Sequence, residues 1–142
     1  MEPVSIHSIR RDIALNFSDL RKEGDVYYLT AELTGRDTQH VSAKVEQAGI
    51  QRLARFFANL AANRKGWDDE KRWESEPGDV TLIATVERLG HIELTVTMRH
   101  GTRADDASVT TTINLESGQL TEIDNDMRDF LGIPRTPPPA AA

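Results

Sequence analysis

The sequence predicts an α+β fold in which an antiparallel sheet of about six to eight strands carries two amphipathic helices. Residues 80–87, 92–99 and 109–115 alternate apolar and polar side chains, which is the pattern of strands with one buried face. Residues 47–65 and 118–131 instead repeat apolar side chains at helical spacing. The predicted order is strands, helix, strands, helix. Periodicity alone leaves open whether the sheet stays open, forms a sandwich or curls into a half-barrel.

Four strands are predicted before the first helix. The charged stretch Asp19–Asp25, which contains Gly24, and the stretch Gly35–Thr38 have the composition of turns between strands. The four predicted strands are Val4–Ile9, Asp12–Phe17, Val26–Leu33 and His40–Val45.

The first helix is predicted over Gln47–Lys65. Apolar residues recur there at spacings of three and four, and arginines and asparagines take the other face. Gly66 follows a basic last turn, where a glycine in the left-handed conformation commonly ends a helix. We therefore expect the helix to stop directly before Trp67. The apolar stripe consists of Ile50, Leu53, Phe56, Phe57, Leu60 and Ala61.

The second helix is predicted over Gly118–Leu131. It follows three alternating strands, of which the first two are joined by the short hairpin connection Arg88–His91. Ser117 is the predicted N-cap, because a hydroxyl at that position accepts a hydrogen bond from the first turn. Gly132 and the proline that follows two residues later are expected to close the helix.

The length of the chain fits one domain, because 142 residues are enough for a single hydrophobic core. We assign residues 1–133 to a single α+β domain and residues 134–142, which are rich in proline and alanine, to a disordered tail. No segment approaches the ~20 apolar residues of a membrane span, and the first residues lack the apolar stretch of a signal peptide. A cytoplasmic protein without membrane contact is therefore expected.

The net charge of −6 bears on the kind of partner. It argues against a nucleic-acid partner, because phosphate binding requires clustered lysine and arginine. It favours a basic protein partner, although a modest negative charge also simply keeps a protein soluble. The sequence does not indicate the oligomeric state.

No residue pattern indicates catalysis, a cofactor or a metal. The chain has no cysteine, which excludes thiol catalysis and zinc–thiolate sites. Its four histidines lack the close spacing of zinc ligands, and no serine lies in a Gly-x-Ser-x-Gly elbow. We therefore expect a non-enzymatic protein with no catalytic, cofactor-binding or metal-binding residues.

The segment Gly66–Asp79 holds the most distinctive residues: both tryptophans, six acids, and the two bases Lys71 and Arg72. In one interpretation the tryptophans pin a surface segment to the core and the acids face water. In the other the tryptophans anchor a partner whose basic groups the acids attract. An acidic catalytic or magnesium site is disfavoured, because Asp-x-Asp spacing is missing and the bases neutralise part of the charge. The residues predicted to bind a partner are Trp67, Asp68, Asp69, Glu70, Trp73, Glu74 and Glu76.

An ordered set of short motifs runs through the middle of the chain. The motifs are Phe56-Phe57, Leu60-Ala61, Gly66-Trp67, Lys71-x-Trp73-x-Ser75, Gly78-Asp79 and Gly90-His91. This set resembles a bacterial domain family of unknown function, from which the chain departs at Glu76-Pro77, where that family more often has Leu-Glu. The layout of the elements is also similar, more loosely, to the wall-associated-protein immunity family, which neutralises toxins delivered by cell contact. That similarity implies an interaction function by analogy.

Two hypotheses about function follow. The first is an uncharacterised bacterial protein that binds another protein without catalysis, and toxin immunity is one version of this function. The alternative is a small-ligand-binding protein or an enzyme with its site between sheet and helices. The alternative is suggested by a threonine-rich sheet face that carries Thr81, Thr95, Thr97, Thr110 and Thr112.

Overall fold

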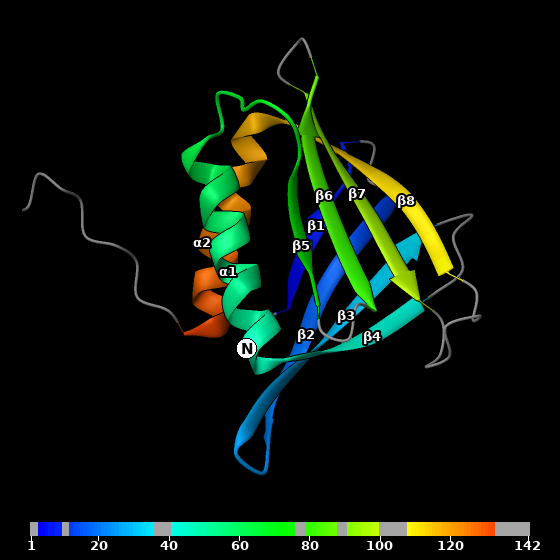
Figure 1. Ribbon diagram of the computed structural model, residues 1–142, viewed down its shortest axis with the longest axis vertical. Coiled ribbons are helices and arrows are strands. Elements are labelled where there is room, and N and C mark those ends of the chain that lie inside the picture. Colours follow the sequence, from blue (N-terminus) through cyan, green and yellow to red (C-terminus); the bar gives the residue numbers. More distant parts are fainter. Residues whose placement is uncertain are drawn as a thin grey trace, which may run out of the picture.

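The computed structural model describes residues 3–9, 12–35, 41–75, 79–87, 91–99 and 108–132. These residues form two four-stranded antiparallel sheets and two helices (Figure 1). The α+β class and the order of strands and helices are therefore confirmed, and the number of strands lies within the predicted six to eight. The predicted tail and most of the predicted Arg88–His91 connection lie outside the described residues. The elements are β1 (Val4–His7), β2 (Ile13–Glu23), β3 (Val26–Gly35), β4 (Val41–Glu46), α1 (Gln47–Ala62), β5 (Lys71–Glu74), β6 (Val80–Val86), β7 (Ile92–Arg99), β8 (Ser108–Leu115) and α2 (Ser117–Leu131).

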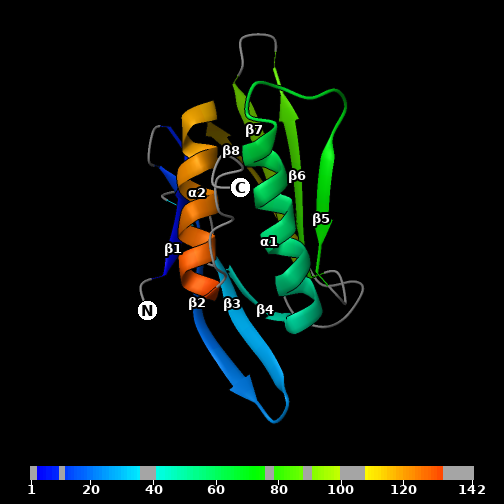
Figure 2. The same ribbon diagram turned by 90° about the vertical axis from the view of Figure 1, so that its left-hand side faces the viewer.

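The chain is built as two similar halves, each a sheet of four sequential strands followed by a helix. The strand orders are β1-β2-β3-β4 and β5-β6-β7-β8, so β1 and β5 are equivalent edge strands of the two sheets. Each helix lies beside the first strand of the other half. Figure 2 shows α1 and α2 side by side, with β1 beyond α2 on one flank and β5 beyond α1 on the other.

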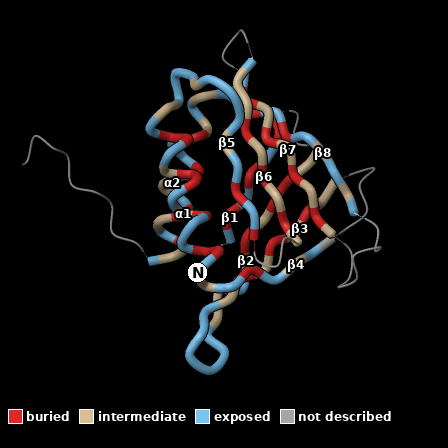
Figure 3. Tube along the Cα trace, viewed as in Figure 1, coloured by how far each residue is buried: buried red, intermediate tan, exposed pale blue. Residues whose placement is uncertain are grey.

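A single hydrophobic core lies between the two sheets and the two helices. Buried residues alternate with more exposed ones along the strands (Figure 3), and the buried apolar residues form this core. Phe57 of α1 packs edge-on against Phe17 of β2, with ring centroids 6.2 Å apart. The sheets also meet at one corner, where the Ile9 N–H donates a hydrogen bond of 2.9 Å to the Asn114 carbonyl in β8. The sequence predicted one sheet, whereas the structure has two sheets that share one hydrophobic core.

The second strand is longer than the sequence predicts. It continues through the expected Asp19–Asp25 turn as far as Glu23, with a bulge after Ser18 and a positive φ of 54° at Asp19. The Arg21 guanidinium bridges Asp19 and Glu23 at 3.0 Å each, so charges that indicated a turn instead pair along the strand. The β2–β3 hairpin consequently projects beyond the rest of the molecule (Figure 1).

The first helix ends earlier than predicted, at Ala62 rather than before Trp67. Asn63 ends it: its backbone N–H and its side-chain Nδ2 both donate to the Asn59 carbonyl, at 3.1 and 2.8 Å. Gly66 has a φ of 132°, outside the left-handed helical conformation, and is therefore not the capping residue that the sequence suggested.

The second helix begins one residue before the predicted start. Its N-cap is Glu116 rather than Ser117, because Glu116 and Gln119 form a reciprocal capping box. Gly132 ends the helix in the left-handed conformation, with a φ of 69°, which confirms the predicted closure.

Candidate functional site

The two tryptophans of the predicted binding segment are attached to the core. Trp73 lies in β5, is only 4% exposed, and donates a hydrogen bond from Nε1 to the Gly49 carbonyl of α1 at 3.0 Å. Trp67 is half-buried, and its Nε1 donates to the Ala84 carbonyl of β6 at 3.2 Å. The Lys71 ammonium lies 5.8 Å from the Trp67 ring. Both indoles therefore hold the segment against the second sheet and α1.

The acids of the same segment lie in two different places. Asp68, Asp69 and Glu70 are exposed in the stretch before β5, and Asp69 has a positive φ of 59°. Glu74 is exposed on β5, where its carboxylate lies 3.6 Å from the Arg72 guanidinium. Glu76 lies outside the described residues. The structure thus separates Glu74 from the acids that precede β5.

A groove of about 450 Å³ runs between β5 and α1, and we call it the basic groove. Arg52 and Arg55 reach it from α1, and neither forms an ion pair with another described residue. Their spacing of three places them on one face of the helix. Glu74 is the one acid among the described lining residues. The full lining is Arg52, Arg55, Phe56, Asn59, Lys71, Arg72, Trp73 and Glu74.

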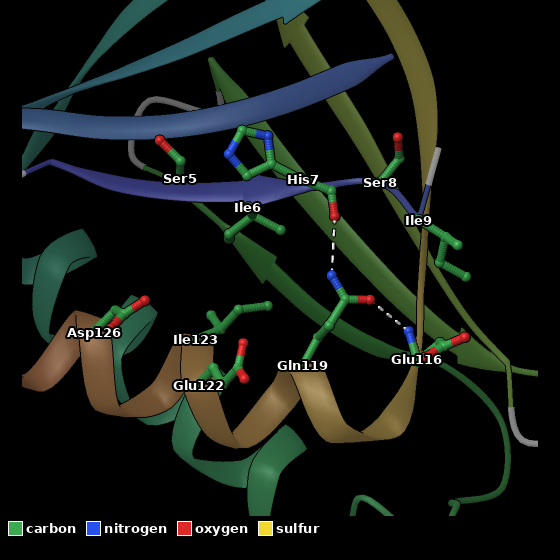
Figure 4. A pocket seen from close by; sticks show the side chains of 10 residues that line it. All are labelled: Ser5, Ile6, His7, Ser8, Ile9, Glu116, Gln119, Glu122, Ile123 and Asp126. Atoms are coloured by element: carbon green, nitrogen blue, oxygen red, sulfur yellow. Dashed lines mark hydrogen bonds between the residues drawn. The ribbon is translucent and has the colours of Figure 1, made fainter. Parts of the chain in front are cut away.

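A second groove, of about 320 Å³, runs between β1 and α2, and we call it the acidic groove (Figure 4). Glu122 and Asp126 line its α2 side, four residues apart and both exposed. Ser5 and His7 line its β1 side. The lining comprises Ser5, Ile6, His7, Ser8, Ile9, Glu116, Gln119, Glu122, Ile123 and Asp126, with no lysine or arginine among them.

Gln119 holds α2 against β1 at one end of the acidic groove. Its Nε2 donates to the His7 carbonyl at 3.1 Å, and its Oε1 accepts the Glu116 N–H at 2.8 Å (Figure 4). One side chain therefore both caps the helix and bridges it to the strand. Beyond this bridge, toward Ser5 and Asp126, residues of β1 line one side of the groove, and the other side is lined by α2, which carries Glu122 and Asp126 (Figure 4).

One backbone edge of β1 faces the acidic groove. The Ser8 N–H donates to the Ile13 carbonyl at 3.0 Å and so continues the ladder between β1 and β2. Because hydrogen-bonding direction alternates along an antiparallel strand, the backbone groups of Ser5 and His7 point away from β2. The bridge from Gln119 to the His7 carbonyl confirms this direction. β1 therefore presents a strand edge to the groove.

The edge of β5 has the same construction. The Ser75 N–H donates to the Val80 carbonyl at 2.9 Å, which assigns the backbone groups of Trp73 and Lys71 to the ladder with β6. The backbone groups of Arg72 and Glu74 consequently point away from β6. Equivalent strands in the two halves thus present their open edges beside grooves of opposite charge.

Two exposed carboxylates outside the grooves have shifted pKa values. A hydrogen bond with Glu87, added to the repulsion between the two like charges, raises the pKa of Glu93 above its usual range. A hydrogen bond from Lys44, assisted by Arg21, lowers the pKa of Glu23. Both environments are local surface contacts, and neither adjoins one of the two grooves.

The threonine-rich face that suggested a ligand site forms contacts within the sheet. Hydroxyl groups of Thr97 and Thr110 lie 3.1 Å apart across β7 and β8, and those of Thr95 and Thr112 lie 3.5 Å apart. Among the described residues, no three His, Cys, Asp or Glu side chains are placed to hold a metal ion. In the part of the chain that the structure describes, neither helix has the length and apolar character needed to cross a membrane.

The sequence did not reveal the acidic groove. The sequence does predict that Glu122 and Asp126 share one face of the second helix, because they are four residues apart. Nothing local says that this helix face lies against β1, more than a hundred residues earlier in the chain. The basic groove was likewise hidden, because helical spacing predicts only that the arginines of this helix lie opposite its apolar stripe.

These features define a two-sheet α+β domain with an acidic and a basic groove along its two edge strands. The chain belongs to the family described as "Family of unknown function (DUF6228)", which matches residues 6–134. This match confirms the resemblance to a domain family of unknown function. No curated protein matches the sequence. A solved structure titled "Crystal structures of trypanosoma bruciei MRP1/MRP2" is similar with a TM-score of 0.48 and 13% identity, over 92% of this chain and 85% of that chain. This likeness carries no functional argument.

Proposed function

We propose that this protein acts by binding another protein, and that its acidic groove takes an extended basic segment of the partner. The observation that carries the proposal is the backbone edge of β1, which lies beside Glu122 and Asp126 in one groove and is bridged by Gln119 only at the His7 carbonyl. An extended peptide that adds to a sheet edge gains main-chain hydrogen bonds, while its alternate side chains select the sequence. Carboxylates on the opposite wall select lysine and arginine at those positions.

The acids before β5 are a second candidate surface for the same partner. Asp68, Asp69 and Glu70 are exposed and carry three negative charges close together. They attract a basic protein at long range, whereas the tryptophans stabilise the segment from below. The proposal includes the expectation from the sequence that this is a bacterial, cytoplasmic protein. It also includes an immunity-like function, in which the partner is a basic toxin.

A defined peptide tests the proposal. The probe is a short peptide in which lysine alternates with valine, and binding is measured by fluorescence anisotropy at low and at high salt. We expect binding that weakens with salt and is lost in the double variant Glu122→Lys/Asp126→Lys. A matched peptide with glutamate in place of lysine is expected not to bind.

The control is Asp25→Lys/Glu87→Lys, which changes the net charge by the same amount at two exposed acids outside both grooves. We expect this variant to retain most of the peptide affinity. Equal loss in both variants would show that binding reflects net charge rather than the acidic groove, and would contradict the proposal.

A further inference from the structure

We infer that the basic extended segment that fits the acidic groove is β5 of a second copy of this chain. This inference rests on the proposed function, because it names the occupant of the same groove. The contact joins the β1 edge of one copy to the β5 edge of another and makes one continuous sheet across the two. The acidic groove of the first copy then faces the basic groove of the second.

The charges of the two grooves are complementary. The described lining of the acidic groove has three carboxylates and no lysine or arginine, whereas that of the basic groove has four bases and one carboxylate. Pairing β1 with β5 brings α2 of one copy beside α1 of the other. Glu122 and Asp126 then lie opposite Arg52 and Arg55, which have no ion pair with another described residue of their own chain. Complementary charges of this kind favour pairing of an acidic groove with a basic groove over pairing of two grooves of the same charge.

The two strands also match in length and direction. β1 and β5 each contain four residues, and each directs the backbone groups of two of them away from its own sheet. In Figure 2 the chain runs upward through β1 and downward through β5. A second copy turned about the vertical axis of that view therefore presents its β5 antiparallel to β1.

An edge strand that is neither charged nor covered is a site of uncontrolled pairing. Here the grooves beside the two edges carry opposite charges, so that each edge favours the other and disfavours a copy of itself. Because the two surfaces differ, the contact is heterologous, and repeated pairing closes into a ring or continues as a chain of copies.

Sedimentation velocity over a range of protein concentrations tests the inference on the full chain. We expect the wild type to assemble beyond the monomer at low salt, and to dissociate as salt screens the facing charges. Arg52→Glu/Arg55→Glu, which alters only the basic groove, is expected to weaken association about a hundredfold or more, because like charges then face each other. Glu122→Lys/Asp126→Lys is expected to have the same effect.

An equimolar mixture of the two reversed variants gives the decisive result. We expect it to assemble again, because the unchanged acidic groove of one variant meets the unchanged basic groove of the other. The control Asp25→Lys/Glu87→Lys, at two exposed acids outside both grooves, should assemble as the wild type does, and circular dichroism verifies that each variant is folded.

A wild type that is monomeric at every concentration and salt would overturn the inference, as would two reversed variants that assemble alone or a mixture that does not. The failure of this inference is distinguishable from failure of the proposed function. If the wild type is monomeric but still binds the lysine–valine peptide, the acidic groove remains a binding site for a basic partner. Only the inference that a second copy of this chain occupies the groove is then contradicted.

Discussion

The acidic groove beside β1 and the basic groove beside β5 occupy equivalent places in the two halves of the molecule, yet they carry opposite charges. In both, a four-residue edge strand lies next to the helix that follows the other sheet. The comparison shows that the backbone repeats while the groove-lining side chains diverge. A fold repeated in one chain can therefore supply two complementary surfaces.

The grooves also differ in how strand and helix are joined. At the basic groove a buried indole, Trp73, fills the space between β5 and α1 and bonds to Gly49. At the acidic groove the exposed amide of Gln119 makes the corresponding link to His7. Burial of a large ring stabilises far more than one exposed hydrogen bond.

The largest expected effect is that of Trp73→Ala. Removal of this side chain leaves a cavity beneath β5 and should lower the free energy of unfolding by about 3–5 kcal/mol, as measured by chemical denaturation. Trp73→Phe keeps most of the packing and loses the hydrogen bond to Gly49, so its cost should be about 1–3 kcal/mol. A loss below about 1 kcal/mol for the alanine variant would mean that the ring does not anchor the basic groove.

A smaller effect is expected at the acidic groove from Gln119→Glu. The new carboxylate still accepts the Glu116 N–H but has no N–H to donate to the His7 carbonyl, so the variant removes the bridge and keeps the cap acceptor. We expect a loss of about 1 kcal/mol in denaturant unfolding. Gln119→Ala removes both interactions and should cost more, by about 0.5–2 kcal/mol for the cap. Equal losses in the two variants would argue against the bridge.

The strands and helices could be predicted from the sequence, whereas their assembly into two sheets could not, because it depends on contacts between distant residues. Alternation at Ile92–Met98 and helical spacing at Ile50–Leu60 are local, and they correctly placed buried faces on β7 and α1. The division into two sheets depends on contacts such as Ile9 with Asn114, which no local pattern specifies. The same holds for the grooves, each of which joins a strand to the helix of the other half.

The end of α1 shows how local signals can compete. A glycine after a basic turn predicted the helix to continue to Lys65, but Asn63 bonds back to Asn59 and ends the helix earlier. Asparagine side chains favour such local backbone bonds over helix continuation. Seven residues were predicted to bind a partner. One of them, Trp73, is buried and supports β5 from the core. The binding role of the exposed acids stays a prediction.

The smallest expected effect concerns a carboxylate pair outside both grooves. Glu87 raises the pKa of Glu93, so the folded state binds this proton more tightly than the unfolded state does. The pair therefore costs stability above the raised pKa, and this cost disappears as the pH falls toward the usual carboxylate range. Glu87→Gln should stabilise the protein by about a few tenths of a kcal/mol near neutral pH and by nothing in acid. Thermal unfolding against pH measures the difference, and a gain that persists in acid would contradict it.

Amide hydrogen exchange at the two strand edges tests most directly the central claim, that the acidic groove binds an extended basic segment by adding a strand to β1. The measurement uses the Arg52→Glu/Arg55→Glu variant, whose acidic groove is unchanged, with and without the lysine–valine peptide. We predict that the peptide slows exchange at the Ser5 and His7 N–H groups and leaves those of Arg72 and Glu74 unaffected. Peptide binding without protection at Ser5 and His7, or with protection at Arg72 and Glu74 instead, would contradict the account.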